Sequence, residues 1–335
     1  MHYLRTIYNP PAYQGAKKKR KYFEGWYHKH VSADGQHAIS VIGGISHNEN
    51  KESQAFIQII DGESGRTAWI PFPAEAFVAC PRSYDVWIGN NHFHSRGLTV
   101  DVSNDEITFK ADLEYNNLTD LQNRSLFQPG IMGWYRFVPR MECYHGIVSL
   151  DHQVSGTITI DDTTVNMDGG YGYMEKDWGR SMPNSWIWFQ TNYFTDARAS
   201  IMFSLADIPW LSSSFPGFLA ICHTGETQQR FTTYNGAKIS AISVGDTNVR
   251  VEFVNDTHVL TVDAQSSASG TLLAPQHGSM VRPIGESLDT KAQIRLSDHK
   301  GRKLLDTTTS ASGLEQVGPT RELVKAIQKK YQTGR

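Results

Sequence analysis

The chain has 335 residues with 32 basic and 34 acidic side chains, so its formal net charge is −2 at pH 7. A general nucleic-acid binder needs a basic excess, and this balance argues against that class of protein. Hydrophobic residues make up 39% of the chain and charged residues 20%, which predicts a packed core, and the length is sufficient for two domains.

The N-terminal region carries a basic run, KKKRK, from Lys17 to Lys21. Such a run is typical of a nuclear address or of a patch that binds anionic surfaces. It also fits a solvated arm, which is the interpretation we favour for residues 1–20. We find no apolar segment like that of a secretory signal, no transit-peptide pattern and no run of eighteen apolar residues. With three scattered cysteines, the sequence predicts a cytoplasmic protein without disulfides.

Short alternating segments follow along most of the chain. Examples are AISVIG at Ala38–Gly43, AFIQII at Ala55–Ile60 and ASIMFSL at Ala199–Leu205. Turn signals such as Asp34-Gly35 and Asp61-Gly62 separate them. Short strands at this spacing predict an all-β sandwich or barrel.

The pattern also repeats. The segment from Trp26 resembles the segment from Trp188, and the one from Thr99 resembles the one from Arg250. Two copies of this size predict two small antiparallel barrels, each able to hold one ligand. The expected boundaries are an arm at 1–20, a first barrel at 21–163, a Gly-rich linker with the EKDWG motif at 164–183, a second barrel at 184–312, and a helix and tail at 313–335. Apolar residues at four-residue spacing predict one helix over Pro319–Tyr331.

Candidate site residues gather in the stretch YMEKDWGRSMPNSWIWFQTN, Tyr173–Asn192. Residues two apart in a strand face the same side. The first half therefore places on one face Tyr173, Glu175 and Asp177, with Met174, Lys176 and Trp178 opposite. The second half places on one face Trp186, Trp188, Gln190 and Asn192. The matching strand of the first copy offers on one face Glu24, Trp26, His28 and His30. Tryptophans mixed with a few polar groups fit the wall of a ligand cavity.

A carboxyl group among tryptophans is desolvated, and desolvation raises its pKa. Glu175 could then hold a proton at neutral pH and act as a general acid, while indole faces stabilise a nearby cation. The competing interpretation is that Glu175, Lys176 and Asp177 form a structural ion-pair cluster beside tryptophans that fill a barrel. The HxH pairs at His28 and His92 lack a third ligand at sensible spacing, so no metal site is expected.

Two segments, KYFEGWYHK and GYMEKDWGRSMPNSWIWFQTN, resemble the tocopherol cyclase family. Its members carry an F-E-G-W-Y segment near the start and an E-K-x-W-G…F-P-x-x-W-x-W-x-Q-x-N segment in the middle of the chain. The residues that carry the resemblance are Phe23, Glu24, Gly25, Trp26, Tyr27, Glu175, Lys176, Trp178, Gly179, Pro183, Trp186, Trp188, Gln190 and Asn192. Met182 replaces the usual aromatic residue before the proline, and the pattern is more similar to a bacterial-type member than to the plant enzyme.

The resemblance implies two lipocalin-like barrels, because the family is related to two-domain lipocalin-like carotenoid hydratases. It implies a cofactor-independent, metal-free cyclase that protonates an alkene and closes a ring by phenol addition on a prenylated aromatic or terpenoid. Glu175 would donate the proton beside Tyr173, and Asp177 or Glu24 would accept the phenol proton. The predicted substrate contacts are Trp26, His28, Trp178, Trp186, Trp188, Gln190 and Asn192.

Two other functions fit the same sequence. One is a carrier that binds a lipophilic small molecule without chemistry, and the other is an alkene hydratase. In each case the expected partner is a hydrophobic small molecule, with peripheral membrane contact to collect it. Neither nucleic acid nor an obligate protein partner is implied. Only the enzymes need a buried group that delivers a proton.

Overall fold

The computed structural model describes residues 6–139, 141–210, 213–267 and 269–332. They form two compact units: unit 1 comprises Met1–Met182 with Gly270–Ile284, and unit 2 comprises Pro183–Ser269 with Gly285–Arg335. Strands dominate both units, as the alternating sequence segments predicted, and the fold is all-β with one short C-terminal helix. None of the described helices is long and apolar enough to cross a membrane.

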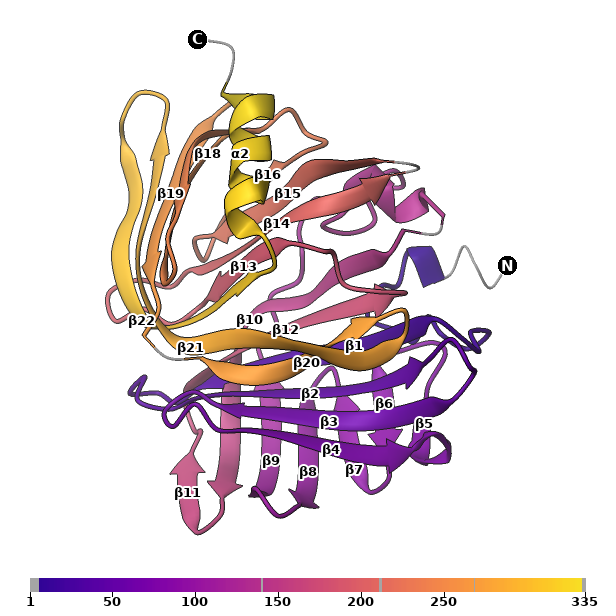
Figure 1. Ribbon diagram of the computed structural model, residues 1–335. Helices are drawn as coiled ribbons and strands as arrows, with labels where there is room; N and C mark the ends of the chain where they lie inside the picture. Colours follow the sequence, from indigo (N-terminus) through magenta and orange to yellow (C-terminus); the bar gives the residue numbers. More distant parts are fainter. Residues whose placement is uncertain (1–5, 140, 211–212, 268, 333–335) are drawn as a thin grey trace. The chain divides into compact units, whose positions relative to one another are not determined.

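Unit 1 is built on an antiparallel sheet, here sheet 1, which has 12 strands in the described chain. Its strands are β1 (Tyr22–Val31), β2 (Ala38–His47), β3 (Ser53–Asp61), β4 (Thr67–Pro73), β5 (Phe77–Ala79), β6 (Asp85–Ile88), β7 (Asn91–His94), β8 (Gly97–Ser103), β9 (Thr108–Asn116), β10 (Cys143–Ile160), β11 (Thr163–Asn166) and β12 (Gly170–Gly179). They run in the order β4-β3-β2-β1-β12-β10-β9-β8-β7-β6-β5, with β11 paired to β10 (Figure 1). Two short 3-10 helices, η1 (Ala74–Ala76) and η2 (Gly133–Phe137), join the strands.

Unit 2 is built on sheet 2, in which the described residues form 10 strands. Its strands are β13 (Trp186–Thr191), β14 (Ser200–Trp210), β15 (Ser213–His223), β16 (Gln228–Thr232), β17 (Lys238–Val244), β18 (Asn248–Val254), β19 (His258–Gln265), β20 (Gly270–Gln276), β21 (Ser279–Asp298) and β22 (Lys303–Val317). The order β16-β15-β14-β13-β22-β21-β19-β18-β17 repeats that of sheet 1, strand for strand, from β4 to β7. The repeated order confirms the internal duplication and the pair of lipocalin-like barrels.

The Gly-rich segment expected as a linker is instead a central strand. β12 lies between β1 and β10, and β22 takes the same place in sheet 2. Its glycines allow close packing, because a Cβ at Gly172 would lie 2.1 Å from His152 Nε2 on β10. The Gly content therefore reflects tight strand packing in this case rather than a flexible connection.

A second difference concerns β20 and the start of β21. The sequence placed them inside the second barrel, whereas Gly270–Ile284 groups with unit 1. Gln58 of β3 fixes this hairpin, because its side-chain amide donates to Leu273 O and accepts from Leu273 N, at 3.1 and 2.7 Å.

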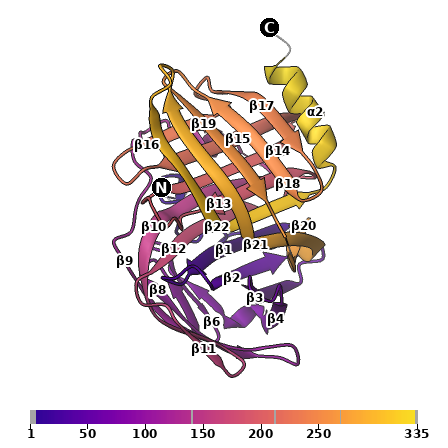
Figure 2. The same cartoon turned by 90° about the vertical axis from the view of Figure 1, so that its left-hand side faces the viewer.

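Each barrel has its own core. In unit 1 the core combines residues of β1, β2, β3, β8 and β9 with Met174 of β12. In unit 2 it includes Ile187 and Phe189 of β13 and the apolar stripe of the C-terminal helix α2 (Thr320–Tyr331), which packs against β17 and β15 (Figure 2). The predicted helix is confirmed, since Leu323 and Ile327 are buried at the expected spacing.

Candidate functional site

β12 carries charged residues on both of its faces. Alternation along the strand places Tyr173, Glu175 and Asp177 on one face, here the Glu175 face. Met174, Lys176 and Trp178 occupy the other, here the Lys176 face. Pairing with β1 sets Trp26 beside Lys176 and Tyr27 beside Glu175, so each face continues onto the neighbouring strand. The predicted alternation is confirmed, and it separates two clusters that sequence analysis had combined.

On the Lys176 face, Lys176 and Glu24 form an ion pair in which both side chains are fully buried, with Nζ 2.5 Å from Oε1. Lys176 also donates to the backbone oxygens of Pro10 and Ala12, at 2.9 and 2.6 Å. These three contacts use every donor of the ammonium group. Burial lowers the pKa of Lys176 to about 8, against the nearby Glu24 carboxylate, which raises it.

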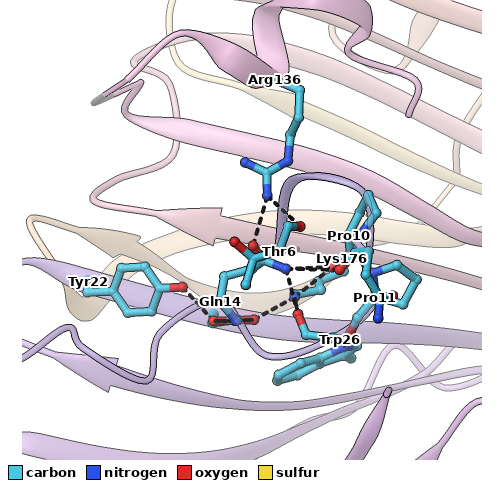
Figure 3. A network of polar contacts seen from close by, with 11 residues as sticks. Thr6, Pro10, Pro11, Gln14, Tyr22, Trp26, Arg136 and Lys176 are labelled. Carbon is cyan, nitrogen blue, oxygen red and sulfur yellow. Dashed lines mark hydrogen bonds and ion pairs between the residues drawn. The ribbon is translucent and has the colours of Figure 1, made fainter. Parts of the chain in front are cut away.

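Glu24 is equally well satisfied. Its carboxylate accepts hydrogen bonds from the Tyr22 hydroxyl and from the backbone N–H of Gln14 (Figure 3). The Gln14 side chain in turn accepts from Arg136 Nη2 at 2.8 Å. Since all these partners are parts of the protein, the cluster holds the N-terminal segment, residues 6–14, against barrel 1. This segment is therefore packed and buried in part, which corrects the expectation of an arm there. Lys17–Arg20 are exposed, as a solvated arm predicts, and residues 1–5 lie outside the described residues.

Two tryptophans enclose the ammonium group of Lys176. Its Nζ lies 4.7 Å from the ring centre of Trp26 and 4.8 Å from that of Trp178, within cation–π range. Trp26 also donates to Pro11 O at 2.9 Å. Glu24, Trp26 and Trp178 therefore lie across the sheet from Glu175. Alternation along β12 already predicted this for Trp178. For Glu24 and Trp26 it follows from the register between β1 and β12, which could not be read from the sequence, so the expectation that they join Glu175 is wrong.

His28 lies deeper in barrel 1, on the same face as Trp26. His28 Nδ1 is 3.1 Å from the hydroxyl of Tyr115, and His28 Nε2 contacts the hydroxyl of Tyr84. The Tyr115 hydroxyl also contacts His30 Nε2 at 2.7 Å. Burial lowers the pKa of His28 well below its usual value, and the neighbouring histidines lower it further. Neutral imidazoles bound to tyrosines fill the barrel interior, so His28 serves the core and does not lie with Glu175.

The Glu175 face carries a different kind of cluster. Tyr173 OH donates to Glu175 Oε2 at 2.6 Å. His145, on the neighbouring strand β10, donates from Nδ1 to Asp177 Oδ1 at 3.0 Å, and its Nε2 lies 3.6 Å from Glu175 Oε2. The second distance is that of an ion pair and too long for a hydrogen bond. Among the described residues, His145 Nε2 is buried without a hydrogen-bond partner.

The charges in this cluster keep a proton on the imidazole of His145. Burial opposes the charge on His145, but Glu175 and Asp177 raise its pKa to about 9, so its imidazole is protonated at neutral pH. The pKa of Tyr173 is raised well above its usual value by burial and by Glu175, so its hydroxyl stays a donor. Cys143 lies beside the cluster, with its Sγ 3.8 Å from Asp177 Oδ1, and burial raises the pKa of this thiol too.

The same three residues also have a spacing that a cation accepts, since ligand atoms of His145, Glu175 and Asp177 lie within 4.8 Å of one another. A metal-binding imidazole must be neutral, however, whereas these carboxylates hold a proton on His145. A cation bound here would therefore compete with the proton on His145. His145 was missed by the sequence analysis because it precedes Glu175 by 30 positions in the chain, and only the pairing of β10 with β12 joins them.

The remaining predicted residues lie in unit 2. β13 turns Ile187 and Phe189 into the core of barrel 2, so Trp186, Trp188 and Gln190 face away from it. Trp188 is thus not the structural equivalent of Trp26, which faces the core of its own barrel. A shift of one residue reverses every side chain of a strand.

The β13 face has polar partners of its own. The indole N–H of Trp186 donates to Glu315 on β22, and Gln190 donates to Asn192 at 3.3 Å. Trp188 pairs with Glu315 in sheet 2 as Tyr27 pairs with Glu175 in sheet 1. Glu315 is a carboxylate that the sequence analysis did not single out, and the duplication was the signal that could have identified it.

Two barrels of one strand order, with a buried carboxylate–imidazole cluster on the first, define a duplicated lipocalin-like protein. The family is fixed by the sequence: residues 90–318, more than half of the chain, match the model of the tocopherol cyclase-like family. The chain belongs to this family, which confirms the resemblance seen in its motifs.

Curated relatives agree with this assignment. The chain is 25% identical over 198 residues to the chloroplastic tocopherol cyclase of Zea mays, covering 56% of this chain and 41% of that protein. It is 24% identical over 203 residues to a probable chloroplastic tocopherol cyclase of Oryza sativa subsp. japonica, covering 57% and 43%. The match thus spans less than half the length of either relative.

Solved structures share the fold. Kievitone hydratase from Nectria haematococca has a TM-score of 0.52 and 12% identity, with 88% of this chain and 89% of that one covered. CghA with Sch210972 has a TM-score of 0.54 and 10% identity, with 89% of each chain covered. At such identity these likenesses describe the two-domain architecture alone.

Proposed function

We propose that the protein is a cofactor-independent cyclase, which closes a ring on a prenylated aromatic or terpenoid by protonating an alkene. The observation that carries this proposal is the position of Glu175, between the hydroxyl of Tyr173 and the protonated imidazole of His145. A buried carboxylate with a charged proton source beside it can deliver a proton without exchange with bulk water.

In the proposed reaction, Glu175 transfers a proton to one carbon of the alkene, and the π electrons form the new C–H bond. The tertiary cation that results is captured by the phenol oxygen, whose lone pair forms the C–O bond. The phenol proton returns to the cluster at Asp177, since Glu24 lies on the other face of the sheet. The proton that Glu175 transfers comes from His145 Nε2–H, and Asp177 then returns the phenol proton to His145, so the cluster regains its starting state and no electrons are gained or lost overall.

The substrate contacts predicted on β13 of unit 2 stay a separate prediction. Trp186, Trp188, Gln190 and Asn192 are all buried. Indoles can stabilise a carbocation, and amides can orient a phenol. A Trp188→Leu variant should therefore raise KM or lower kcat for a prenylated substrate while unit 2 keeps its stability. If neither constant changes by more than twofold, Trp188 makes no substrate contact.

Turnover of a prenylated hydroquinone tests the proposal. Chroman formation is followed by liquid chromatography and mass spectrometry for the wild type, for Glu175→Gln, and for the control Tyr22→Phe on the other face of the sheet. We expect the first variant to lose at least about a hundredfold in kcat, because a missing general acid costs that much, and the control to keep its activity.

Each alternative function has its own outcome in this experiment. Addition of water in place of ring closure identifies a hydratase that uses the same acid. Tight binding of the quinol by the wild type with no product at any pH identifies a carrier and refutes the catalytic proposal. Equal turnover by the wild type and Glu175→Gln refutes the assignment of the acid.

A further inference from the structure

The loop between β9 and β10 ends in a tight turn with two large apolar residues at its tip. Ser125 and Gln128 exchange backbone hydrogen bonds of 3.0 and 3.1 Å, so Leu126 and Phe127 form a two-residue connection, here the apolar tip. Such turns usually carry Gly, Asn or Asp. Here the side chains of Leu126 and Phe127 are 71% and 79% exposed.

Further aromatic side chains adjoin the apolar tip. Tyr8 of the N-terminal segment donates from its hydroxyl to Leu126 O at 2.9 Å and is 41% exposed. Its ring lies 6.2 Å from that of Phe137 on η2, and η2 also carries the half-exposed Trp134. Exposed apolar groups gathered in this way mark an interaction surface rather than scattered surface residues.

The exposed charge beside the tip is positive. It comes from Arg124, and the sequence has no acidic residue between Asp120 and Glu142. The N-terminal segment that carries Tyr8 continues into the exposed basic residues Lys17–Arg20. A partner for this surface must therefore offer an apolar interior beneath a negatively charged surface.

We infer that the apolar tip inserts into the surface of an anionic lipid bilayer, with Tyr8 and Trp134 at the level of the headgroups. Amphipathic aromatic rings favour the membrane interface, and nearby Lys and Arg add attraction to anionic lipids. The same loop reaches the candidate site, because His145 N–H contacts Met132 Sδ at 3.1 Å.

Vesicle flotation tests this inference with the full-length chain. Wild type and Leu126→Ser/Phe127→Ser are mixed with vesicles of phosphatidylglycerol and phosphatidylcholine, and with vesicles of phosphatidylcholine alone. The wild type should float with the anionic vesicles, and the double variant should bind about tenfold or more weakly, because each buried apolar side chain contributes strongly to interfacial binding. Arg124→Glu should weaken binding to the anionic vesicles and leave binding to the phosphatidylcholine vesicles unchanged.

Val281→Ser is the matched control, since Val281 is 59% exposed but lies on β21, outside this loop. Equal flotation of wild type and the double variant, or no flotation of the wild type, would overturn the inference. So would a wild-type dimer that the double variant dissociates in analytical ultracentrifugation, because the tip would then bind a second copy of the chain.

The test is separate from the chemistry proposed for Glu175. Glu175→Gln should bind vesicles as the wild type does, and the double variant should turn over a short-chain, water-soluble substrate at the wild-type rate. In the wild type, turnover without vesicle binding would refute the membrane inference alone, and vesicle binding without turnover would refute the proposed function alone.

Discussion

The two faces of β12 carry buried charges that are satisfied in different ways. On the Lys176 face, each donor of the ammonium group and the Glu24 carboxylate have protein partners at hydrogen-bond distance. On the Glu175 face, a protonated imidazole has one nitrogen without a hydrogen-bond partner among the described residues. A saturated network stabilises one structure, whereas an unsatisfied one is typical of a site that reacts. We therefore assign the first cluster to folding and the second to chemistry.

The largest effect on stability is expected from disrupting the Lys176–Glu24 ion pair on the Lys176 face. Lys176→Met leaves Glu24 buried without its counter-charge, and such a loss typically costs about 3–5 kcal/mol of unfolding free energy. Urea unfolding measures it, with Lys325→Met on the exposed surface of α2 as control. A loss below about 1 kcal/mol would show that the pair is not the anchor of the N-terminal segment.

The corresponding change on the Glu175 face should act on turnover above all. His145→Gln removes the proton source and should lower kcat about a hundredfold or more, while its cost in stability is confined to pH values below about 9, where the wild-type imidazole is charged. The pH–rate profile separates catalysis from structure, because the alkaline limb near pH 9 should disappear with the imidazole. An unchanged profile in an active variant would refute the role of His145.

The pH dependence of stability compares the two clusters directly. The pKa of His145 is about 9 in the folded protein against 6.5 unfolded, so its contribution of about 3 kcal/mol is complete below pH 6.5 and is lost as the pH rises to 9. The pKa of Lys176 is about 8 in the folded protein against 10.5 unfolded. Unfolding then takes up a proton at Lys176 between these pH values, so this residue adds stability as the pH rises.

Chemical denaturation at several pH values measures both effects. The free energy of unfolding should fall from pH 6.5 to 8, and the fall should be absent in His145→Gln. Stability that rises across this interval in the wild type would contradict the charge assigned to His145.

The smallest effects come from a matched pair of hydroxyls. Tyr22 donates to Glu24 and Tyr173 donates to Glu175, each two positions along its strand. Tyr22→Phe should cost about 1 kcal/mol of stability and leave turnover intact. Tyr173→Phe removes an equally buried hydrogen bond and should cost a similar amount of stability, but it should also lower turnover about tenfold. The reverse pattern, measured by urea unfolding and steady-state kinetics, would exchange the roles of the two faces.

The sequence predicted much of the fold, because its signals are local. Alternation of polar and apolar residues identified strands. The resemblance between the segments from Trp26 and Trp188 identified the duplication, although it matched the two strands one residue out of register. β12 was mistaken for a linker because Gly172 reads as flexible, whereas its missing side chain makes room for His152. No local signal places Gly270–Ile284 with unit 1, since that depends on Gln58 more than two hundred positions away.

The site was predicted only in part for the same reason. Tyr173, Glu175 and Asp177 share a face because they lie on one strand. Which of the other residues join them depends on strand register, and register placed Glu24 on the opposite side while adding His145 from β10. The burial of Lys176 was equally unexpected, because its partners Pro10 and Ala12 come from a segment that reads as an arm.

The most direct test of the division between the two faces is the protonation state of His145, followed by ¹⁵N NMR of the histidine side chains between pH 6 and 10. Our account predicts an imidazolium at pH 7.5 that titrates with a pKa of about 9, and a lower pKa in Glu175→Gln. A neutral imidazole at pH 7.5 in the wild type would contradict it, because the Glu175 face would then hold no proton for the reaction.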